Sequence, residues 1–398
     1  MKFILALLED GESFAQICHR FGISRQTGYT WKRRFEAEGT RGLADRRPMA
    51  RTHPNATDEG LADQMVDLRK KHPSWGPKKI RAVLVKQAPT AAWPAPSTIG
   101  AVLQRRGMVA SRQPRLRVPP SPTERAQATS PNIVWTVHHK GSFDLINGRC
   151  YPLTLCDLAS HYLLKCEALP STSEAEARPH LEAAFREYGL PERIRSDNGT
   201  PFAASQAPGG LTHLSIWWIK LGISLERIAL GHPEQNGAHE RMHRTLKAEA
   251  ITPGRSDMIE QQRAFDVFRR VYNLERPHEG LGQRIPADVY RRSWRPYPVE
   301  LAELEYPEGM SRRQVADAGS FSFAGERIFL TKLLAGETIG VQPRTDSRWD
   351  VYFGPVWVGQ LYLQEKTWHL QSRQPTSVLP AQESVVERAG LVDARGGA

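Results

Sequence analysis

The central part of the chain begins with Val134-Trp135-Thr136-Val137-His138-His139-Lys140-Gly141, a stretch that predicts a β-strand. A later strand, Arg193-Ile194-Arg195, runs into Ser196-Asp197-Asn198-Gly199. The Asn-Gly pair turns the backbone away and leaves the Asp197 carboxylate at the carboxyl end of the strand. Open α/β sheets place their ligands at that edge. The two segments therefore predict an α/β domain with a polar site at one edge of its sheet.

The sequence around these strands predicts the element order of a ribonuclease-H-like α/β core, placed at residues 132–295. Asn147-Gly148 is a strong two-residue hairpin turn between the first two strands. The predicted strands are 134–143, 151–155, 162–169, 193–195 and 223–228, and the predicted helices are 173–188, 211–221 and 234–250. Three strands, a helix, a strand, a helix, a strand and a helix form the expected order.

Residues 1–46 predict a helix-turn-helix. Ser13 and Ser24 are helix N-caps, and Gly22 takes the turn between the two helices. A recognition helix reads bases with its first residues and holds phosphates with its basic ones. The residues expected to contact DNA are Arg25, Gln26, Thr27, Tyr29, Lys32 and Arg33.

The remaining segments predict a multidomain chain with all-α units before the α/β core and a β-rich domain after it. Residues 58–108 predict a second helix-turn-helix-like unit, with Pro77 and Pro96 in the first turns of two helices. Residues 109–131 are rich in proline and arginine, which predicts a linker. Residues 320–372 predict a small β domain, for which an SH3-like barrel is the candidate fold. The tail, 373–398, is expected to be disordered.

Composition supports a nucleic-acid partner. The 398 residues carry a formal net charge of +11, which suits a polyanion because Lys and Arg release its condensed counterions. The apolar run Phe3–Leu8 is too short for a signal peptide or a membrane span. The four cysteines show no C-x-x-C spacing, which argues against a zinc ribbon or a disulfide framework. A bacterial cytoplasmic protein without membrane partners is expected.

The stretch from Trp135 to Tyr290 contains Asp197-Asn198-Gly199, a helix with Glu240, and Tyr272-Asn273-Leu274-Glu275-Arg276-Pro277-His278-Glu279-Gly280-Leu281. It resembles the integrase core of IS481-type insertion-sequence transposases, which belong to the D-D-E superfamily. The resemblance implies binding to the terminal inverted repeats of the element, metal-dependent strand cleavage and transfer into target DNA. It also implies three catalytic acids with two Mg²⁺ (or Mn²⁺) ions, a homo-oligomer on DNA and an association with the nucleoid.

Carried over residue by residue, the second and third acids of the family fall on Asp197 and Glu240, which are the expected metal ligands, and the first falls on His138. An imidazole removes one negative charge, and Mg²⁺ accepts nitrogen ligands poorly, whereas Mn²⁺ tolerates them better. Arg244 and Lys247 share the helix face of Glu240 and are expected to hold phosphate. Two hypotheses remain open: a transposase with reduced activity, or a catalytically inactive, sequence-specific DNA-binding relic.

Two further interpretations concern single residues. With a turn at Asn147-Gly148, Asp157 would lie opposite His138 and could lend the missing carboxylate; otherwise it caps the end of its strand. His239-Glu240-Arg241-Met242-His243 also matches H-E-x-x-H, the pattern of zinc metallopeptidases, in which both histidines bind zinc and Glu240 would be the general base.

Overall fold

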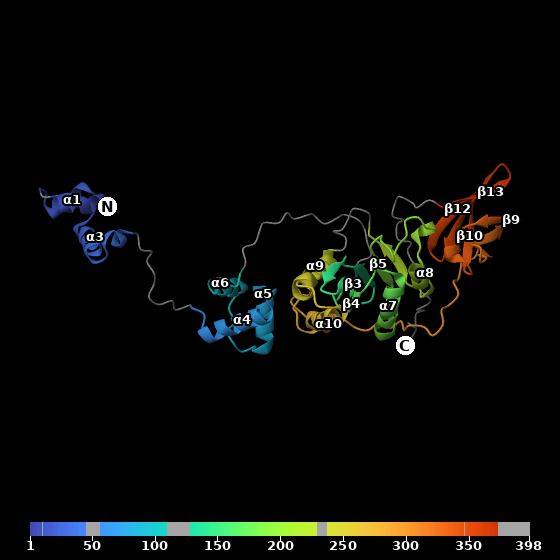
Figure 1. Ribbon diagram of the computed structural model, residues 1–398, viewed down its shortest axis with the longest axis horizontal. Coiled ribbons are helices and arrows are strands. Elements are labelled where there is room, and N and C mark those ends of the chain that lie inside the picture. The colour runs from blue at the N-terminus through green and yellow to red at the C-terminus, as the bar shows by residue number, and fades with distance from the viewer. Residues whose placement is uncertain (10, 45–55, 110–127, 229–236, 346, 373–398) are drawn as a thin grey trace, which may run out of the picture. The chain divides into compact units, whose positions relative to one another are not determined.

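The computed structural model describes residues 1–9, 11–44, 56–109, 128–228, 237–345 and 347–372. The chain divides into two compact units, Met1–Asp58 and Glu59–Ala398 (Figure 1). The expected disordered tail and most of the expected linker lie outside the described residues. Among the described helices, none is long and apolar enough to cross a membrane.

The first unit is the expected helix-turn-helix. Its helices are α1 (Lys2–Leu8), α2 (Phe14–Arg20) and α3 (Arg25–Glu38), followed by the 3₁₀ turn η1 (Gly39–Leu43). Ser13 caps α2 in a capping box, and the Ser24 hydroxyl accepts from the Thr27 amide at 3.1 Å at the start of α3. A Cβ at Gly28 would lie 2.6 Å from Cys18 Sγ, so the two helices approach where α3 has no side chain.

The second unit begins with three helices that have an apolar core of their own. They are α4 (Glu59–Lys71), α5 (Pro77–Gln87) and α6 (Pro96–Arg105). Pro77 and Pro96 occupy the first turns of α5 and α6, as the sequence predicted. The buried side chains they share are Met65, Val66, Trp75, Ile80, Leu84, Trp93, Ile99 and Leu103. We call this segment the helical unit.

The central domain is built on a six-stranded mixed sheet. Its strands are β1 (Val134–His139), β2 (Phe143–Leu145), β3 (Gly148–Asp157), β4 (Leu163–Leu169), β5 (Arg193–Ser196) and β6 (Ser224–Arg227). The order is β2-β3-β1-β5-β6, with β4 paired to β3. β1, β5 and β6 are mutually parallel, whereas the pairs among β1 to β4 are antiparallel. The order of strands and helices along the chain follows the prediction, except that the first predicted strand is divided into β1 and β2.

Helices cover both faces of this sheet (Figure 1). They are α7 (Glu174–Tyr188), η2 (Pro208–Gly210), α8 (His213–Lys220), α9 (Gly237–Leu246), η4 (Lys247–Ile251, a π-helical turn), α10 (Met258–Leu274), η5 (Glu279–Leu281) and α11 (Pro286–Val289). Trp135 and Val137 of β1 pack against α7 and α8. The opposite face, with Cys156 of β3, packs against α9 and α10. Because side chains alternate along a strand, Thr136 and His138 lie on the α9 side.

The hairpin between the first strands differs from its prediction. Leu145 pairs with Gly148, so the turn residues are Ile146 and Asn147 rather than Asn147 and Gly148. The amides of Ile146 and Asn147 donate to the carbonyls of Arg255 and Ser256 at 3.1 and 2.8 Å, which fixes the turn against the segment before α10. The predicted first strand is also interrupted, and β1 and β2 pair with β3 in registers that differ by one residue.

The C-terminal part is β-rich, as predicted, but its strands begin at Ser311. They are β7 (Ser311–Gln314), β8 (Ser320–Phe323), β9 (Glu326–Phe329), β10 (Thr338–Thr345), β11 (Arg348–Phe353), β12 (Val356–Gln364) and β13 (Thr367–Gln371), with η6 (Lys332–Leu334). Five form a sheet in the order β13-β12-β11-β10-β7, and β8 pairs with β9. Their apolar cluster includes Leu211, Ile216 and Ile219 of the central domain, so the two parts share one hydrophobic core.

His278, in the loop after α10, is expected to make stability depend on pH. Burial, followed by the charge of Lys79, lowers the pKa of His278 to about 3. The unfolded chain therefore binds a proton below about pH 6.5 that the folded chain does not. The free energy of unfolding should fall as the pH drops from 6.5 toward 4, by up to about 1.4 kcal/mol per pH unit for this group. Urea unfolding at several pH values measures it, and a His278→Phe variant with an undiminished slope would contradict it.

Candidate functional site

His138 and Asp197 meet because β1 and β5 are parallel neighbours. Thr136 lies opposite Arg195, and two residues farther along both strands come His138 and Asp197. His138 Nε2 lies 3.2 Å from Asp197 Oδ2, and about a third of each side chain is exposed. The residues expected at the first and second acid positions are therefore in contact, as an imidazole and a carboxylate.

The turn after β5 holds the Asp197 carboxylate in place. The Gly199 amide donates to Asp197 Oδ1 at 3.0 Å. Asn198 Nδ2 donates to the Ile228 carbonyl at 2.6 Å and ties the end of β5 to the end of β6. One carboxylate oxygen thus faces the turn, and the other faces His138.

Glu240 lies in the first turn of α9, on the same side of the sheet as His138. Its side chain is exposed, as are those of Arg244 and Lys247, so these three form an outward stripe. Burial lowers the pKa of His138, and the opposing charges of Asp197 and, more weakly, Glu240 do not reverse this. His138 thus contacts Asp197, and Glu240 lies in α9 on the same side of the sheet as His138.

His239 and His243 face the sheet and not the stripe of Glu240. His239 shares hydrogen bonds with the hydroxyls of Thr136 (2.6 Å) and Thr154 (2.7 Å), and His243 Nε2 lies 2.8 Å from the Thr154 hydroxyl. Burial lowers the pKa of His239 to about 3 and that of His243 further. Both histidines are neutral and anchor α9 to the sheet. The metallopeptidase interpretation is therefore wrong in its geometry: the Thr154 hydroxyl occupies the place where two zinc ligands would converge.

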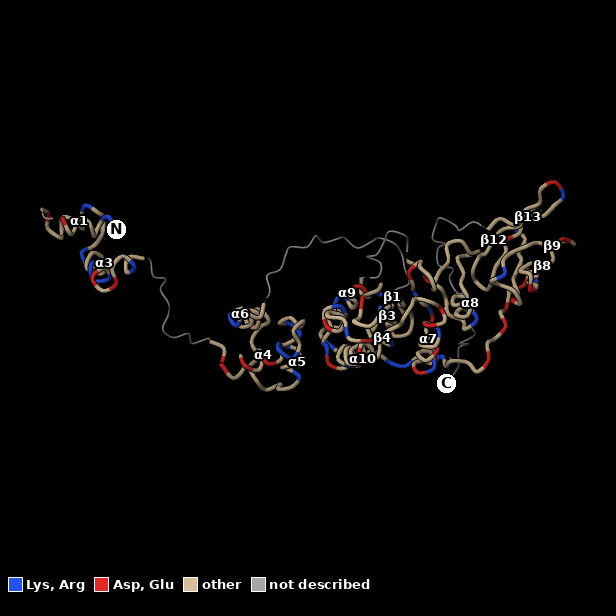
Figure 2. Tube along the Cα trace, viewed as in Figure 1, with Lys and Arg blue, Asp and Glu red and all other residues tan. Residues whose placement is uncertain are grey.

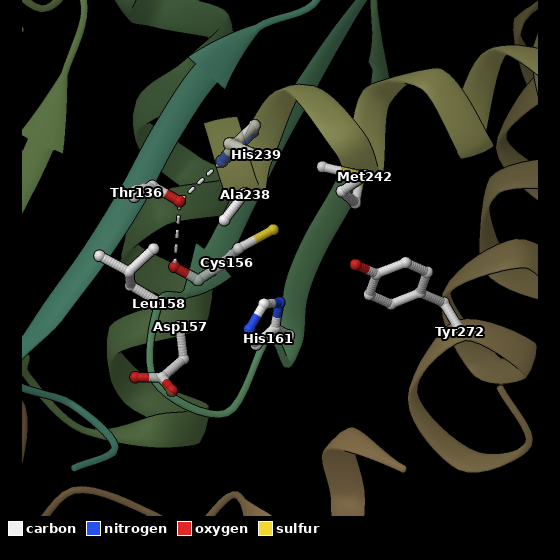
Figure 3. A pocket seen from close by; sticks show the side chains of 9 residues that line it. All are labelled: Thr136, Cys156, Asp157, Leu158, His161, Ala238, His239, Met242 and Tyr272. Carbon is white, nitrogen blue, oxygen red and sulfur yellow. Dashed lines mark hydrogen bonds between the residues drawn. The ribbon is translucent and has the colours of Figure 1, made fainter. Parts of the chain in front are cut away.

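Asp157 does not reach His138, and the prediction that it could is wrong. The residue opposite His138 is Thr154, and Asp157 lies opposite Trp135, three positions away, because the turn lies one residue earlier and the register shifts again between β2 and β1. Asp157 is fully buried. Its carboxylate accepts from the amides of Asn132 and Ser160, both at 2.7 Å. It caps the end of β3, below the small cavity beside His239 (Figure 3).

The donor set does not fit a pair of Mg²⁺ ions. Mg²⁺ requires oxygen ligands in near-octahedral geometry, and the site offers two carboxylates and an imidazole that contacts one of them. Among the described residues, no group of three or more His, Cys, Asp or Glu side chains has a geometry that could hold a metal ion. The arrangement gives three polar groups in reach of a phosphodiester, with a nitrogen where a third carboxylate would be needed.

The six residues expected to read DNA in the first unit all lie on α3 and are exposed. Figure 2 marks the basic residues of this helix. Tyr29 stacks on Phe14 with ring centroids 4.2 Å apart, and Lys32 pairs loosely with Glu36 at 3.8 Å. The Thr27 hydroxyl is hydrogen-bonded to Ser24 at 2.9 Å. The helix therefore presents a basic and polar face.

Comparison with protein families agrees with this geometry. Residues 221–286, which include α9 and Glu240, match the family model of the integrase core domain. Residues 221–286 of the central domain are thus similar to an integrase core. Residues 1–51 match a helix-turn-helix domain, and residues 27–103 match a homeodomain-like domain. Helix-turn-helix units thus precede the integrase core.

Viral polyproteins are among the curated relatives of the chain. The chain is 30% identical over 124 residues to the Gag-Pol polyprotein of baboon endogenous virus (strain M7), covering 31% of this chain and 7% of the polyprotein. It is 30% identical over 126 residues to the Gag-Pol polyprotein of feline leukemia virus, covering 32% and 7%. The chain therefore spans less than a tenth of the length of these relatives.

Solved integrases are similar at low identity. A chain of the simian T-cell lymphotropic virus intasome, solved in complex with PP2A regulatory subunit B56 gamma, is 15% identical with a TM-score of 0.34, covering 74% of this chain and 97% of that chain. The HTLV-2 integrase catalytic core domain, solved in complex with magnesium in a dimeric form, is 14% identical with a TM-score of 0.30, covering 41% and 99%.

Sequence reasoning missed Thr154, which joins the site to α9. Its hydroxyl donates to the His138 carbonyl at 3.1 Å and contacts both buried histidines of α9. The sequence does mark Thr154 as unusual, because it is a polar residue within the apolar run of β3. Its role follows only from the register of β1 against β3.

Proposed function

We propose that the chain is an insertion-sequence transposase of the IS481 type that binds the ends of its element and whose strand cleavage and strand transfer are impaired at His138. The contact between His138 Nε2 and Asp197 Oδ2, at 3.2 Å, carries this proposal. It places a nitrogen donor on the carboxylate that corresponds to the family's second acid. If the substitution at His138 abolishes strand cleavage completely, the protein is a DNA-binding relic. It would then compete with active transposase copies for the same element ends.

Phosphoryl transfer at such a site depends on stabilising charge on the attacking and leaving oxygens. Asp197 and Glu240 supply two carboxylates, and His138 supplies no third negative charge. The residues present thus favour binding and orientation of DNA over its cleavage. Arg244 and Lys247, exposed beside Glu240, would hold phosphates of the bound strand.

The partners that we propose are the terminal inverted repeats of the element and its target DNA. The net charge of +11 and the basic exposed face of α3 support this choice. We also propose a homo-oligomer that pairs two ends, in the bacterial cytoplasm and associated with the nucleoid. These proposals follow the resemblance to transposases.

End binding is tested on α3. Arg25→Gln should weaken binding to a duplex with the terminal repeat by about 1–3 kcal/mol, whereas Lys32→Gln should weaken binding to all duplexes alike and reduce the salt slope by about one. Fluorescence anisotropy at several salt concentrations measures both effects. Arg20→Gln removes one cation from α2, where Arg20 pairs with Glu12, and is the matched control. Equal affinity for repeat and scrambled duplexes would exclude sequence-specific end binding.

A further inference from the structure

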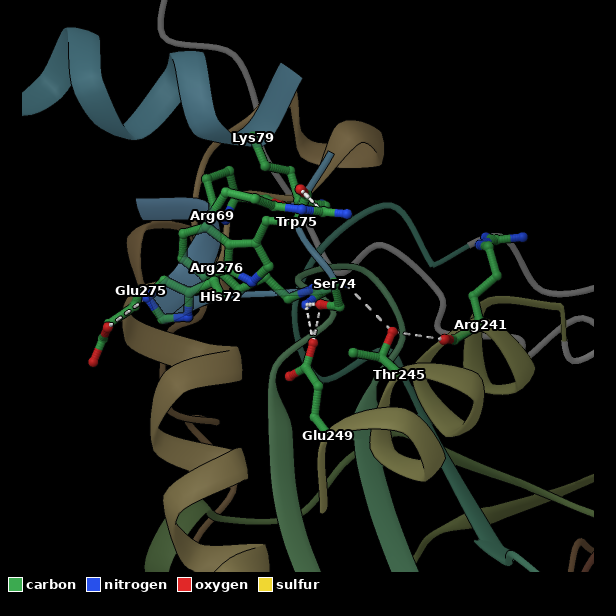
Figure 4. Close-up of polar contacts among 11 residues, drawn as sticks. Arg69, His72, Ser74, Trp75, Lys79, Arg241, Thr245, Glu249, Glu275 and Arg276 are labelled. Atoms are coloured by element: carbon green, nitrogen blue, oxygen red, sulfur yellow. Dashed lines mark hydrogen bonds and ion pairs between the residues drawn. The ribbon is translucent and has the colours of Figure 1, made fainter. Parts of the chain in front are cut away.

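One buried cation joins the helical unit to the integrase core. Arg276, which follows α10, is 8% exposed. Its Nη1 donates to Glu249 Oε1 at 2.7 Å and to the Ser74 hydroxyl at 3.1 Å, and Ser74 is also hydrogen-bonded to Glu249 (Figure 4). Ser74 lies just before α5, whereas Glu249 lies in the π-helical turn that follows α9. We call Ser74, Thr245, Glu249 and Arg276 the Arg276 node.

The node reaches the helix that carries Glu240. Arg276 Nη2 lies 3.5 Å from the Thr245 hydroxyl, which donates to the Arg241 carbonyl at 3.2 Å. Arg241 is the neighbour of Glu240 on α9. Residues Lys247–Ile251 form the π-helical turn η4, and Glu249 within this turn accepts the hydrogen bond from Arg276. Single π-helical turns of this kind occur frequently at functional sites.

Three lysines of the helical unit make further contacts with the segment that follows α10. Lys79 donates to the Pro277 carbonyl, and burial lowers the pKa of Lys79 to about 8. Lys78 pairs with Glu279 and Lys71 with Glu275, but all of these side chains are more than a third exposed. Exposed ion pairs contribute about 0–1 kcal/mol each. The main contacts between the two parts are therefore those of buried Arg276, those of Lys79, and the packing of Val271 of α10 against the core of the helical unit.

The segment that carries Ser74 is packed into the core of the helical unit. Trp75 is 1% exposed, belongs to the unit's own core and follows Ser74 directly. His72 stacks on Trp75 with ring centroids 3.8 Å apart. On α6 the side chains of Ser97, Gln104 and Arg105 are exposed, which leaves that helix open to a duplex. A shift at Ser74 therefore shifts α6.

We propose that the Arg276 node fixes the helical unit to the end of α9, so that duplex DNA held by α6 is presented at a set distance to Asp197 and Glu240. The proposal rests on the proposed function for its DNA partner. The node residues are positioning residues, because they contact α9 and the helical unit and not the site itself.

The test measures the distance between spin labels at Gln104→Cys on α6 and Arg241→Cys on α9 in the full chain. The four native cysteines are buried, and burial raises the pKa of Cys150 to about 12, so the introduced thiols react first. The node variant combines Glu249→Gln with Arg276→Met, which leaves no lone buried charge. Lys78→Gln, which loses one exposed pair, is the matched control.

We expect one narrow distance peak in the otherwise unaltered chain and in Lys78→Gln, and loss of that peak in the node variant at an unchanged melting temperature. A narrow peak at the same distance in the folded node variant would overturn the proposal. If the node variant fails to fold, the Ser74→Ala variant is measured in its place. A distance peak as narrow as that of the otherwise unaltered chain would then overturn the proposal. Anisotropy with end DNA on the labelled chain tests the proposed function separately, because the distance measurement needs no DNA.

Discussion

Cleavage of end DNA in Mg²⁺ is expected to rise by about a hundredfold, or about 2.7 kcal/mol of transition-state stabilisation, when His138→Asp is introduced. The substitution replaces a nitrogen donor with a carboxylate and removes the imidazole that contacts Asp197 Oδ2. Three carboxylates then face the site, which is the donor type that Mg²⁺ prefers. In Mn²⁺ the difference between the two proteins should be smaller, because Mn²⁺ accepts imidazole more readily.

The measurement is single-turnover strand cleavage of a labelled duplex that carries the terminal repeat. His138→Asn is the matched control, since it removes the imidazole without adding a charge. Activity in His138→Asp alone would identify the unaltered chain as a DNA-binding relic with an otherwise preserved site. Equal rates in Mg²⁺ for the unaltered chain and His138→Asp would show that histidine serves at this position, contrary to the proposal.

Asp157→Ala is expected to lower the free energy of unfolding by about 3 kcal/mol or more, because buried donors that lose their acceptor cost about 1–3 kcal/mol each. The amides of Asn132 and Ser160 would both lose their acceptor. These donors fix the start of β1 and the turn between β3 and β4. Asp157→Asn keeps one oxygen acceptor and should cost less. Urea unfolding at neutral pH gives the values.

The same Asp157→Asn variant separates a structural role from a catalytic one. Its end cleavage in the His138→Asp background should equal that of His138→Asp alone, because Asp157 lies opposite Trp135 and not opposite His138. Lys78→Gln provides the comparison for an exposed change outside the central domain. Selective loss of cleavage in a stable Asp157→Asn protein would restore Asp157 to the site.

Local signals in the sequence predicted most of the fold. Serine caps at residues 13, 24 and 173 and prolines at 77 and 96 lie where helices start, and the structure confirms each of these starts. Side-chain alternation placed the strands of the sheet within a few residues. These helix starts can be predicted from the sequence because a capping side chain or the fixed φ of a proline acts only on neighbouring residues.

Features that depend on distant segments were not predictable from one sequence. The hairpin turn lies one residue early because its amides bind carbonyls of Arg255 and Ser256, more than a hundred positions away. That shift, together with the further register shift between β2 and β1, moved Asp157 away from His138 and put Thr154 in its place. Likewise, His239 and His243 are buried against Thr154 because α9 packs on the sheet. The H-E-x-x-H pattern alone does not predict this packing.

The hydrophobic core that the C-terminal strands share with α8 determines where the chain can be cut. Ile216 and Ile219 project from α8 into the cluster that holds Val351, Phe353 and Val358. A chain that stopped before Ser311 would leave this face of α8 in water beside the loop that follows Asp197. The central domain and the strands after it therefore fold as one piece, and a chain truncated between them is expected to aggregate through this exposed apolar face.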